Sequence, residues 1–324
     1  MVTDGQDNEQ IILATGGYDH TIKLWQTHTG MCHRTMQHSE SQVNALEITP
    51  DKKLLAAASY QHINMYDLLS NNPNSIVNYE GTSKNVTCVG FNDDGRLMYS
   101  GGEDGRVRIW DLRSKNINCS NTFETLPGSG SSLSPINCAA LHPNQIELFL
   151  GDQNGIIYRW DVRTPLNQQF IPENDVTILD IDISPDGTQM ASVNNKGNAY
   201  IWNLSSTDID GKTSLQPRHK FTAHKRAALK CKYSPDSCFL ITTSADQTAK
   251  IWDTEDYNLQ KELKQDSQRW VWDAAWSADS QYVFTASSDS CAKLWNVSKG
   301  TMEREYAGHQ KAVTALAFRD TVIN

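Results

Sequence analysis

The sequence predicts an all-β fold: a single β-propeller of seven blades, with the closing blade shared between the N-terminal and C-terminal segments. Three observations in the 324 residues predict it. An aromatic pattern recurs with a period near 45 residues, the stretches between its copies read as strands and turns, and the first and last repeats are each incomplete. Radial repetition of small sheets shields strand edges, so a long chain of short strands can form one domain in this way.

The repeat is marked by an aromatic residue that closes a short β-branched run. Successive markers lie 41 to 50 residues apart, which is close to the ~40–45 residues of WD40 repeats. The seven marked segments are IKLWQ (Trp25), INMYD (Tyr66), VRIWD (Trp110), IYRWD (Trp160), AYIWN (Trp202), AKIWD (Trp252) and AKLWN (Trp295). Seven markers predict seven blades.

Within each repeat, apolar runs alternate with tight turns. The clearest copy is ALKCKYSPD, FLITTSADQ and TAKIWDT, in residues 228–254. Alternation of apolar and polar residues with β-branched side chains is typical of strands, and Pro-Asp, Asp-Gly and Asn turns bound them. Since sustained helical periodicity is almost absent, we expect an all-β chain with four strands in each repeat.

The two ends of the chain complement each other. GHQKAVTALAFRD (308–320) reads as an innermost strand with nothing after it, whereas IILATGGYDHTIKLWQT (11–27) reads as a repeat that lacks this strand. Together they make one blade. We therefore expect one propeller over residues 11–320, with short tails at 1–10 and 321–324.

Composition narrows the class of protein. The net charge is −9, from 29 Lys and Arg against 38 Asp and Glu, which argues against a nucleic-acid partner. No apolar run is long enough to span a membrane, and the seven Cys are scattered without a C-x-x-C pair, so neither a disulfide framework nor a zinc module is expected. We expect a soluble, cytoplasmic, monomeric propeller whose partners are proteins.

One repeat contains the complete buried network that WD repeats use, formed by a His, a hydroxyl residue, an Asp and a Trp. Its predicted members are His224, Ser244, Asp246 and Trp252. Elsewhere the pattern is partial, and the second repeat (SYQHINMYD) is one residue shorter. Because each bond of such a network contributes about 1 kcal/mol and an orphaned partner costs more, we assign these residues a structural role.

Motifs of catalysis and cofactor binding are missing from the sequence. It has no Walker loop, H-E-x-x-H, G-x-S-x-G or dinucleotide fingerprint, and GSGSSL (128–133) reads as a flexible loop. His219 and His224 lie in one loop, but their spacing is a weak metal signal. We expect no enzyme activity, no cofactor and no metal. A basic segment at 218–232 reads as a solvated face, or as a docking site for an acidic partner segment.

The residues that flank the start of each innermost strand are candidates for a binding face, because we expect them to ring the channel mouth. Among seven such pairs, Trp270 and Trp272 stand out, since Trp is enriched in interface hot spots; the alternative is that one of them is mainly core. The neighbouring repeats extend this pair into a continuous arc. The predicted protein-binding arc comprises Trp270, Trp272, Gln42, Asn44, Tyr18, Tyr60 and Thr314.

Several segments closely resemble the lethal-with-sec-thirteen family, the G-protein-beta-like WD40 subunits of TOR kinase complexes. They include ILATGGYDHTIKLWQ (12–26), NMYDLLSNNPN (64–74) and RWVWDAAWSADSQYVFTASSD (269–289), and the irregular second repeat is itself a marker. The resemblance spans about residues 10–324. It implies a non-enzymatic subunit of both TOR complexes that docks on the kinase domain, and its kinase-facing surface would include Gln42, Asn44 and Trp270.

The sequence departs from this family in two places. The TLPGSGSSLSP stretch (125–135) is longer than the usual connection, and Ala227 stands where an aromatic residue is expected. Two other functions stay open at this point. A ubiquitin-ligase substrate adaptor would need several Arg at the channel mouth, and a propeller enzyme would need clustered acids, bases or metal ligands there.

Overall fold

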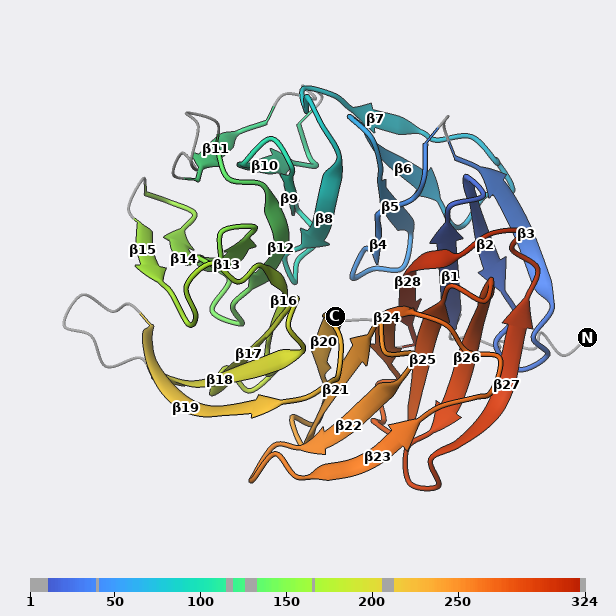
Figure 1. Ribbon diagram of the computed structural model, residues 1–324. Helices are drawn as coiled ribbons and strands as arrows, with labels where there is room; N and C mark the ends of the chain where they lie inside the picture. Colours follow the sequence, from blue (N-terminus) through green and yellow to red (C-terminus); the bar gives the residue numbers. More distant parts are fainter. Residues whose placement is uncertain are drawn as a thin grey trace, which may run out of the picture.

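The computed structural model describes residues 11–38, 41–114, 119–125, 133–164, 167–205 and 213–320. All 28 regular elements within these ranges are β-strands, grouped into seven four-stranded sheets. Figure 1 shows the sheets arranged as blades around a central axis. The prediction of an all-β, seven-bladed propeller is confirmed. The predicted tails (1–10 and 321–324) and most of the 125–135 connection, including nearly all of GSGSSL, lie outside the described residues.

Each blade runs from an innermost strand to an outermost one, and its strands are antiparallel. In that order the blades are β28 (Val313–Arg319), β1 (Ile12–Gly17), β2 (Thr21–Trp25), β3 (Cys32–Gln37); β4 (Ala45–Ile48), β5 (Leu54–Ala58), β6 (Ile63–Asp67), β7 (Val77–Tyr79); β8 (Val86–Phe91), β9 (Leu97–Gly102), β10 (Arg106–Asp111), β11 (Asn121–Glu124); β12 (Ile136–Leu141), β13 (Glu147–Asp152), β14 (Ile157–Asp161), β15 (Asn167–Phe170); β16 (Ile178–Ile183), β17 (Gln189–Asn194), β18 (Asn198–Ser205), β19 (Ser214–Thr222); β20 (Ala228–Tyr233), β21 (Phe239–Ser244), β22 (Ala249–Asp253), β23 (Leu259–Leu263); β24 (Val271–Trp276), β25 (Tyr282–Ser287), β26 (Cys291–Asn296), β27 (Thr301–Ala307).

The ring closes as the incomplete end repeats predict. Strand β28 pairs with β1 in an antiparallel register that sets Ile12 opposite Arg319 and Gly16 opposite Ala315. Apolar side chains from adjacent blades pack against each other, and the closing blade shares one such cluster with β4–β6. Burial between neighbouring blades is therefore the main cohesive contribution in this ring.

In four blades the Trp that marks the repeat donates its indole N–H to a hydroxyl ten positions earlier, on the second strand of its blade, whereas Trp160 donates to the carbonyl of Thr164 (2.9 Å). The pairs are Trp25 with Thr15 (2.7 Å), Trp110 with Ser100 (2.9 Å), Trp252 with Thr242 (2.9 Å) and Trp295 with Thr285 (2.8 Å). The second repeat keeps the link with a different side chain. Its Tyr66 hydroxyl lies 2.8 Å from Nδ1 of His38, while Ala56 stands where the hydroxyl residue would be.

The predicted network in the sixth blade needs one correction. Thr242, not Ser244, joins the His to the Trp, since its Oγ1 lies 2.8 Å from Nε2 of His224 and accepts the Trp252 N–H. Leu240 is opposite Trp252 in the strand register, so the indole reaches Thr242 diagonally. Ser244, two residues further along β21, donates to the carbonyl of Ala227 (2.8 Å) and accepts the N–H of Asp246 (2.9 Å).

A second complete network lies in the closing blade, where the sequence predicts only a partial pattern. Nε2 of His309 lies 2.8 Å from Thr15 Oγ1, and its Nδ1 lies 2.9 Å from Oδ2 of Asp19. Burial opposes ionisation of Asp19, but the N–H of Gln310 and the ring of His309 hold its pKa below the usual value. A repeat-by-repeat comparison misses this network because its members come from the two ends of the chain.

Candidate protein-binding face

One end of the ring gathers the residues of the predicted arc. The chain enters each innermost strand at this end, and the turn between the second and third strands folds over the entry. The N–H of Tyr18 donates to the carbonyl of Ala312 (3.0 Å), and that of Ser288 donates to the carbonyl of Trp270 (2.9 Å). We call this end the turn face. It carries all seven predicted arc residues: Trp270, Trp272, Gln42, Asn44, Tyr18, Tyr60 and Thr314.

The two residues that flank the start of an innermost strand have different surroundings. Those on the C-terminal side line a central channel of about 440 Å³: Asn44, Thr87, Asn137, Leu179, Leu229, Trp272 and Thr314. Those on the N-terminal side, such as Gln42 and Trp270, are not part of the channel lining. The predicted ring of residues at this end therefore consists of two sets, one that lines the channel and one that lies outside the channel lining.

Four of the channel residues connect adjacent blades. Thr314 Oγ1 donates to the carbonyl of Val43 (2.7 Å), and Asn44 Nδ2 donates to the carbonyl of Val86 (3.0 Å). Thr87 and Asn137 repeat this contact with Ile136 and Ile178, each at 2.7 Å. Asn44 and Thr314 thus use their donors within the ring. Pattern analysis missed this role because the acceptor belongs to the next repeat.

Trp270 and Trp272 form one aromatic unit at the edge of the turn face. Their ring centroids are 5.5 Å apart at an interplanar angle of 50°. Trp272 is half-buried and donates its indole N–H to Ser288 Oγ (2.6 Å), whereas Trp270 is 42% exposed. Trp272 therefore packs against Trp270 from the more buried side, and Trp270 is the ring that is exposed to solvent.

Three large aromatic side chains of the arc are exposed. They are Trp270 (42%), Tyr18 (42%) and Tyr60 (50%), and they come from three consecutive blades of the ring (Figure 1). Gln42, which precedes the innermost strand of the same blade as Tyr60, is half-buried. Since Asn44 and Thr314 act between blades, the accessible part of the arc consists of these three aromatic residues and Gln42.

Charged residues cluster deeper in the channel, which the sequence analysis did not foresee. Lys230 Nζ lies 3.3 Å from Asp180 Oδ1, and Asp180 Oδ2 accepts the N–H of Cys231 (2.9 Å) from the next blade. Asp273 accepts the N–H of Leu316 (2.9 Å) in the same way. Burial alone would lower the pKa of Lys230, but Asp180 and Asp273 raise it. These carboxylates accept hydrogen bonds from the backbone of the next blade. The sequence feature that could have indicated this role is the alternation of Asp with apolar residues in ILDIDI (178–183).

The basic segment at 218–232 does not form one surface. Lys230 faces the channel, whereas Lys220 lies on the outermost strand β19 and pairs with Glu173 at 3.3 Å. Lys225 and Arg226 are exposed between β19 and β20. His219 stacks on Phe221, with ring centroids 5.6 Å apart, while His224 belongs to the buried network. The two histidines therefore have separate structural environments.

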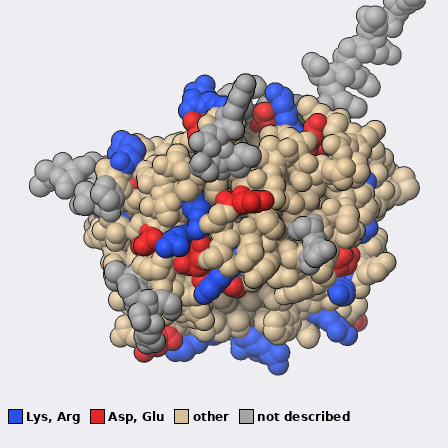
Figure 2. All heavy atoms as spheres, turned by 90° about the horizontal axis from the view of Figure 1, so that it is seen from above, with Lys and Arg blue, Asp and Glu red and all other residues tan. Residues whose placement is uncertain are grey.

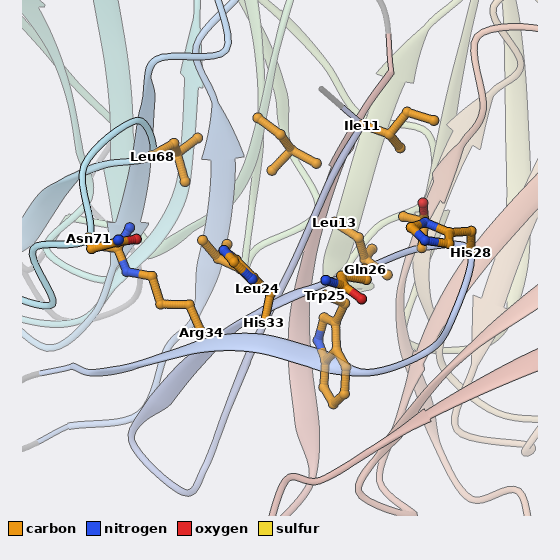
Figure 3. A pocket seen from close by; sticks show the side chains of 12 residues that line it. Ile11, Leu13, Leu24, Trp25, Gln26, His28, His33, Arg34, Leu68 and Asn71 are labelled. Atoms are coloured by element: carbon orange, nitrogen blue, oxygen red, sulfur yellow. The ribbon is translucent and has the colours of Figure 1, made fainter. Parts of the chain in front are cut away.

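Another cavity lies away from the arc. It measures about 560 Å³ and opens between the closing blade and the loop that follows β6. Figure 3 shows Arg34 reaching from β3 toward that loop, where it donates to the carbonyls of Asp67 (3.1 Å) and Ser70 (2.5 Å). Ile12, at the start of β1, lines the cavity and lies opposite Arg319, at the end of the ring remote from the turn face.

Surface charge is mixed. Figure 2 shows one side of the ring, where acidic and basic residues lie close together between broad uncharged areas. Within the ranges that the structure describes, no group of three His, Cys, Asp or Glu side chains could hold a metal ion. The same ranges contain no helix of the length and apolarity needed to cross a membrane.

Comparison with known proteins identifies the repeat and the family. The family model described as "WD domain, G-beta repeat" matches residues 5–26, 30–67, 73–111, 215–253 and 258–296. The chain is 55% identical over 323 residues to the target of rapamycin complex subunit LST8 of Bos taurus, covering 98% of this chain and 97% of that protein. It is 42% identical to the corresponding LST8 of Saccharomyces cerevisiae, covering 96% of this chain and 99% of the yeast protein.

A third relative, the target of rapamycin complex subunit wat1 of Schizosaccharomyces pombe, is 42% identical, with 96% of each chain covered. Near-complete coverage at this identity, together with the seven-bladed ring, confirms the resemblance on which the sequence analysis relied. The chain belongs to the LST8 family of WD-repeat proteins.

Proposed function

We propose that this protein is a non-enzymatic scaffold subunit of TOR complexes 1 and 2. In this proposal it works in the cytoplasm, as a single propeller within a larger assembly, and supports TOR signalling in growth control. The names of its relatives as target of rapamycin complex subunits support the assembly. The proposed partner is the TOR kinase domain, which the propeller binds and stabilises.

The observation that carries the proposed binding mode is the exposed Trp270 on the half-buried Trp272. An exposed indole held by a second ring keeps a fixed position, so a partner loses little side-chain entropy in covering it. Tyr18, Tyr60 and Gln42 extend this surface over the next two blades. We propose that an insertion on the C-terminal lobe of the kinase covers the arc. Binding then favours the active kinase only as far as that state is bound more tightly.

The test is co-precipitation of the TOR kinase with the variant that combines Trp270→Ala and Gln42→Glu. We expect a loss of most of the captured kinase, because truncation removes the aromatic anchor and Glu adds an unpaired charge to the contact. Tyr282→Ala is the matched control, since Tyr282 is a 36% exposed aromatic at the other end of the same blade. Circular dichroism establishes that both variants are folded. Undiminished capture by the double variant rejects this face as the kinase contact.

The ubiquitin-ligase adaptor stays the alternative function. It would recognise acidic or phosphorylated motifs through several Arg at the channel mouth. The side chains that line the described channel include Lys230 and Lys232 but no Arg, and Lys232 is paired with Asp182 at 2.9 Å. A mass-spectrometric census of co-purifying proteins separates the two functions, since one predicts TOR-complex subunits and the other predicts ligase components.

A further inference from the structure

A second hollow lies on the outer side of the ring, between the fourth and fifth blades. It measures about 440 Å³ and is bounded by the end of β15 and by strands β18 and β19. Tyr200 and Trp202 form part of its floor and are almost fully buried, whereas Ile171 on its edge is 55% exposed. An exposed aliphatic side chain beside an aromatic floor is a feature of surfaces that partners cover. We call this hollow the β15–β19 groove.

Basic side chains line the other edge of the groove. Arg218, His219 and Lys220 follow one another on β19 and are exposed. The guanidinium of Arg218 donates to the carbonyl of Glu255 (2.5 Å) rather than to a carboxylate, and it lies 5.6 Å from the Tyr257 ring centroid. In a chain of net charge −9, this edge is a local positive field that favours an acidic partner.

One end of the groove already holds a carboxylate from the same chain. Glu173 accepts hydrogen bonds from Lys196 (3.0 Å), Lys220 (3.3 Å), Asn198 (3.4 Å) and the Tyr200 hydroxyl. The Tyr200 bond and the two lysines lower the pKa of Glu173 to about 2. The groove's own edge residues therefore bind a carboxylate in this fold, and the adjacent Arg218 offers the next position along the edge.

The composition of β19 also limits how a partner can bind. This nine-residue strand is the outermost of its sheet. Its pairing with β18 shifts between Ile201, which lies opposite His219, and Trp202, which lies opposite Pro217, so that Arg218 has no register partner on β18. Pro and basic residues on an edge strand block the addition of a further strand. Protection of the sheet edge explains the presence of Pro217, but it does not explain the exposed Ile171 or the aromatic floor. A partner is thus expected to bind through its side chains.

We propose that the β15–β19 groove docks an acidic peptide segment of a second protein, with one apolar side chain against Ile171 and the aromatic floor and a carboxylate on Arg218 and Lys220. The groove lies across the ring from the Trp270 arc, with the β8–β11 blade on one side and the β20–β23 blade on the other (Figure 1). The propeller can therefore hold two partners at once. This proposal does not depend on the identity of the partner at the arc.

The test measures binding of a fluorescein-labelled peptide of alternating Glu and Leu by fluorescence anisotropy. Arg218→Ala combined with Lys220→Ala should weaken binding about three- to tenfold, since each rim charge pair is worth a fraction of a kcal/mol up to about 1. Lys225→Ala combined with Arg226→Ala is the matched control, because it removes one Lys and one Arg that are exposed in the same segment but outside the groove. That control should bind within about twofold of the wild type.

The apolar half of the proposal has its own variant. Ile171→Ser should weaken binding about fivefold through the loss of buried apolar surface, and a peptide of alternating Glu and Ser should bind the wild type more weakly by a similar factor. Thermal unfolding shows that each variant is folded. The proposal is overturned if the Glu-Leu peptide does not bind, if both double variants weaken it equally, or if an unlabelled RNA oligonucleotide competes better than unlabelled peptide. Kinase co-precipitation by the Arg218 and Lys220 variant should be unchanged.

Discussion

Nε2 of His309 lies 2.8 Å from Oγ1 of Thr15, although 294 positions separate the two residues in the sequence. The same hydroxyl accepts the indole N–H of Trp25 at 2.7 Å, and all three side chains are buried. One hydroxyl thus ties the C-terminal segment to two strands of the N-terminal segment. The closing blade is held by this side-chain bond in addition to the β1–β28 ladder.

Removing that hydroxyl should destabilise the whole ring. Thr15→Val keeps the shape of the side chain but leaves Trp25 Nε1 and His309 Nε2 without their partner, at an expected cost of about 2–4 kcal/mol in the free energy of unfolding. Urea denaturation measures it. Thr122→Val is the matched control, since Thr122 is exposed on strand β11, and it should change stability by less than about 0.5 kcal/mol. Equal effects of the two substitutions would contradict the role given to Thr15.

Stability should fall with acid through His38. Burial, followed by the neighbouring His20 and His62, lowers the pKa of His38 from 6.5 to about 4. As the pH falls, this histidine is therefore protonated at a higher pH in the unfolded chain than in the folded one. The contribution is fully present above pH 6.5 and is lost as the pH falls toward 4, by at most about 3 kcal/mol.

The measurement is urea unfolding at several pH values between 7.5 and 4.5. His38→Gln should be less stable than the wild type at pH 7.5 and should lose less stability on acidification. His33→Gln, at an exposed position on β3, serves as the control and should follow the wild-type curve. A His38→Gln curve parallel to the wild type would show that other groups cause the acid sensitivity.

Substitutions of Asn44 and Trp270 should affect different properties: the first should lower the stability of the ring, and the second should weaken partner binding. Asn44→Ala removes the bond to the Val86 carbonyl and should cost about 1 kcal/mol of stability, whereas Trp270→Ala should leave stability nearly unchanged because its ring is exposed. Chemical denaturation gives the first quantity and kinase co-precipitation the second. Asn71→Ala, in an exposed loop, controls for loss of an amide. The assignment fails if Trp270→Ala destabilises the protein more than Asn44→Ala does.

Repetition made much of this fold predictable. The Trp markers, the turns and the incomplete ends depend on local sequence, so the number of blades and the closure could be inferred without coordinates. Hydrogen-bond partners in adjacent blades could not be predicted in this way. Whether Thr242 or Ser244 meets Trp252 depends on strand register, and Asn44, Thr314 and Asp180 find their partners only when adjacent blades pack side by side. Tyr66 shows the same limit, since its bond to His38 replaces a hydroxyl that the repeat pattern expects elsewhere.

The pairing of β28 with β1 also delays folding during synthesis, because the two strands lie at opposite ends of the chain. A ribosome adding ~5–20 residues per second needs on the order of fifteen seconds to a minute to travel from Thr15 to His309. Throughout that interval the inner edge of β1 has no native partner, and the network of Thr15 and Trp25 lacks His309. The nascent chain thus carries an open strand edge until its last repeat emerges, and such an edge is a template for pairing with another chain.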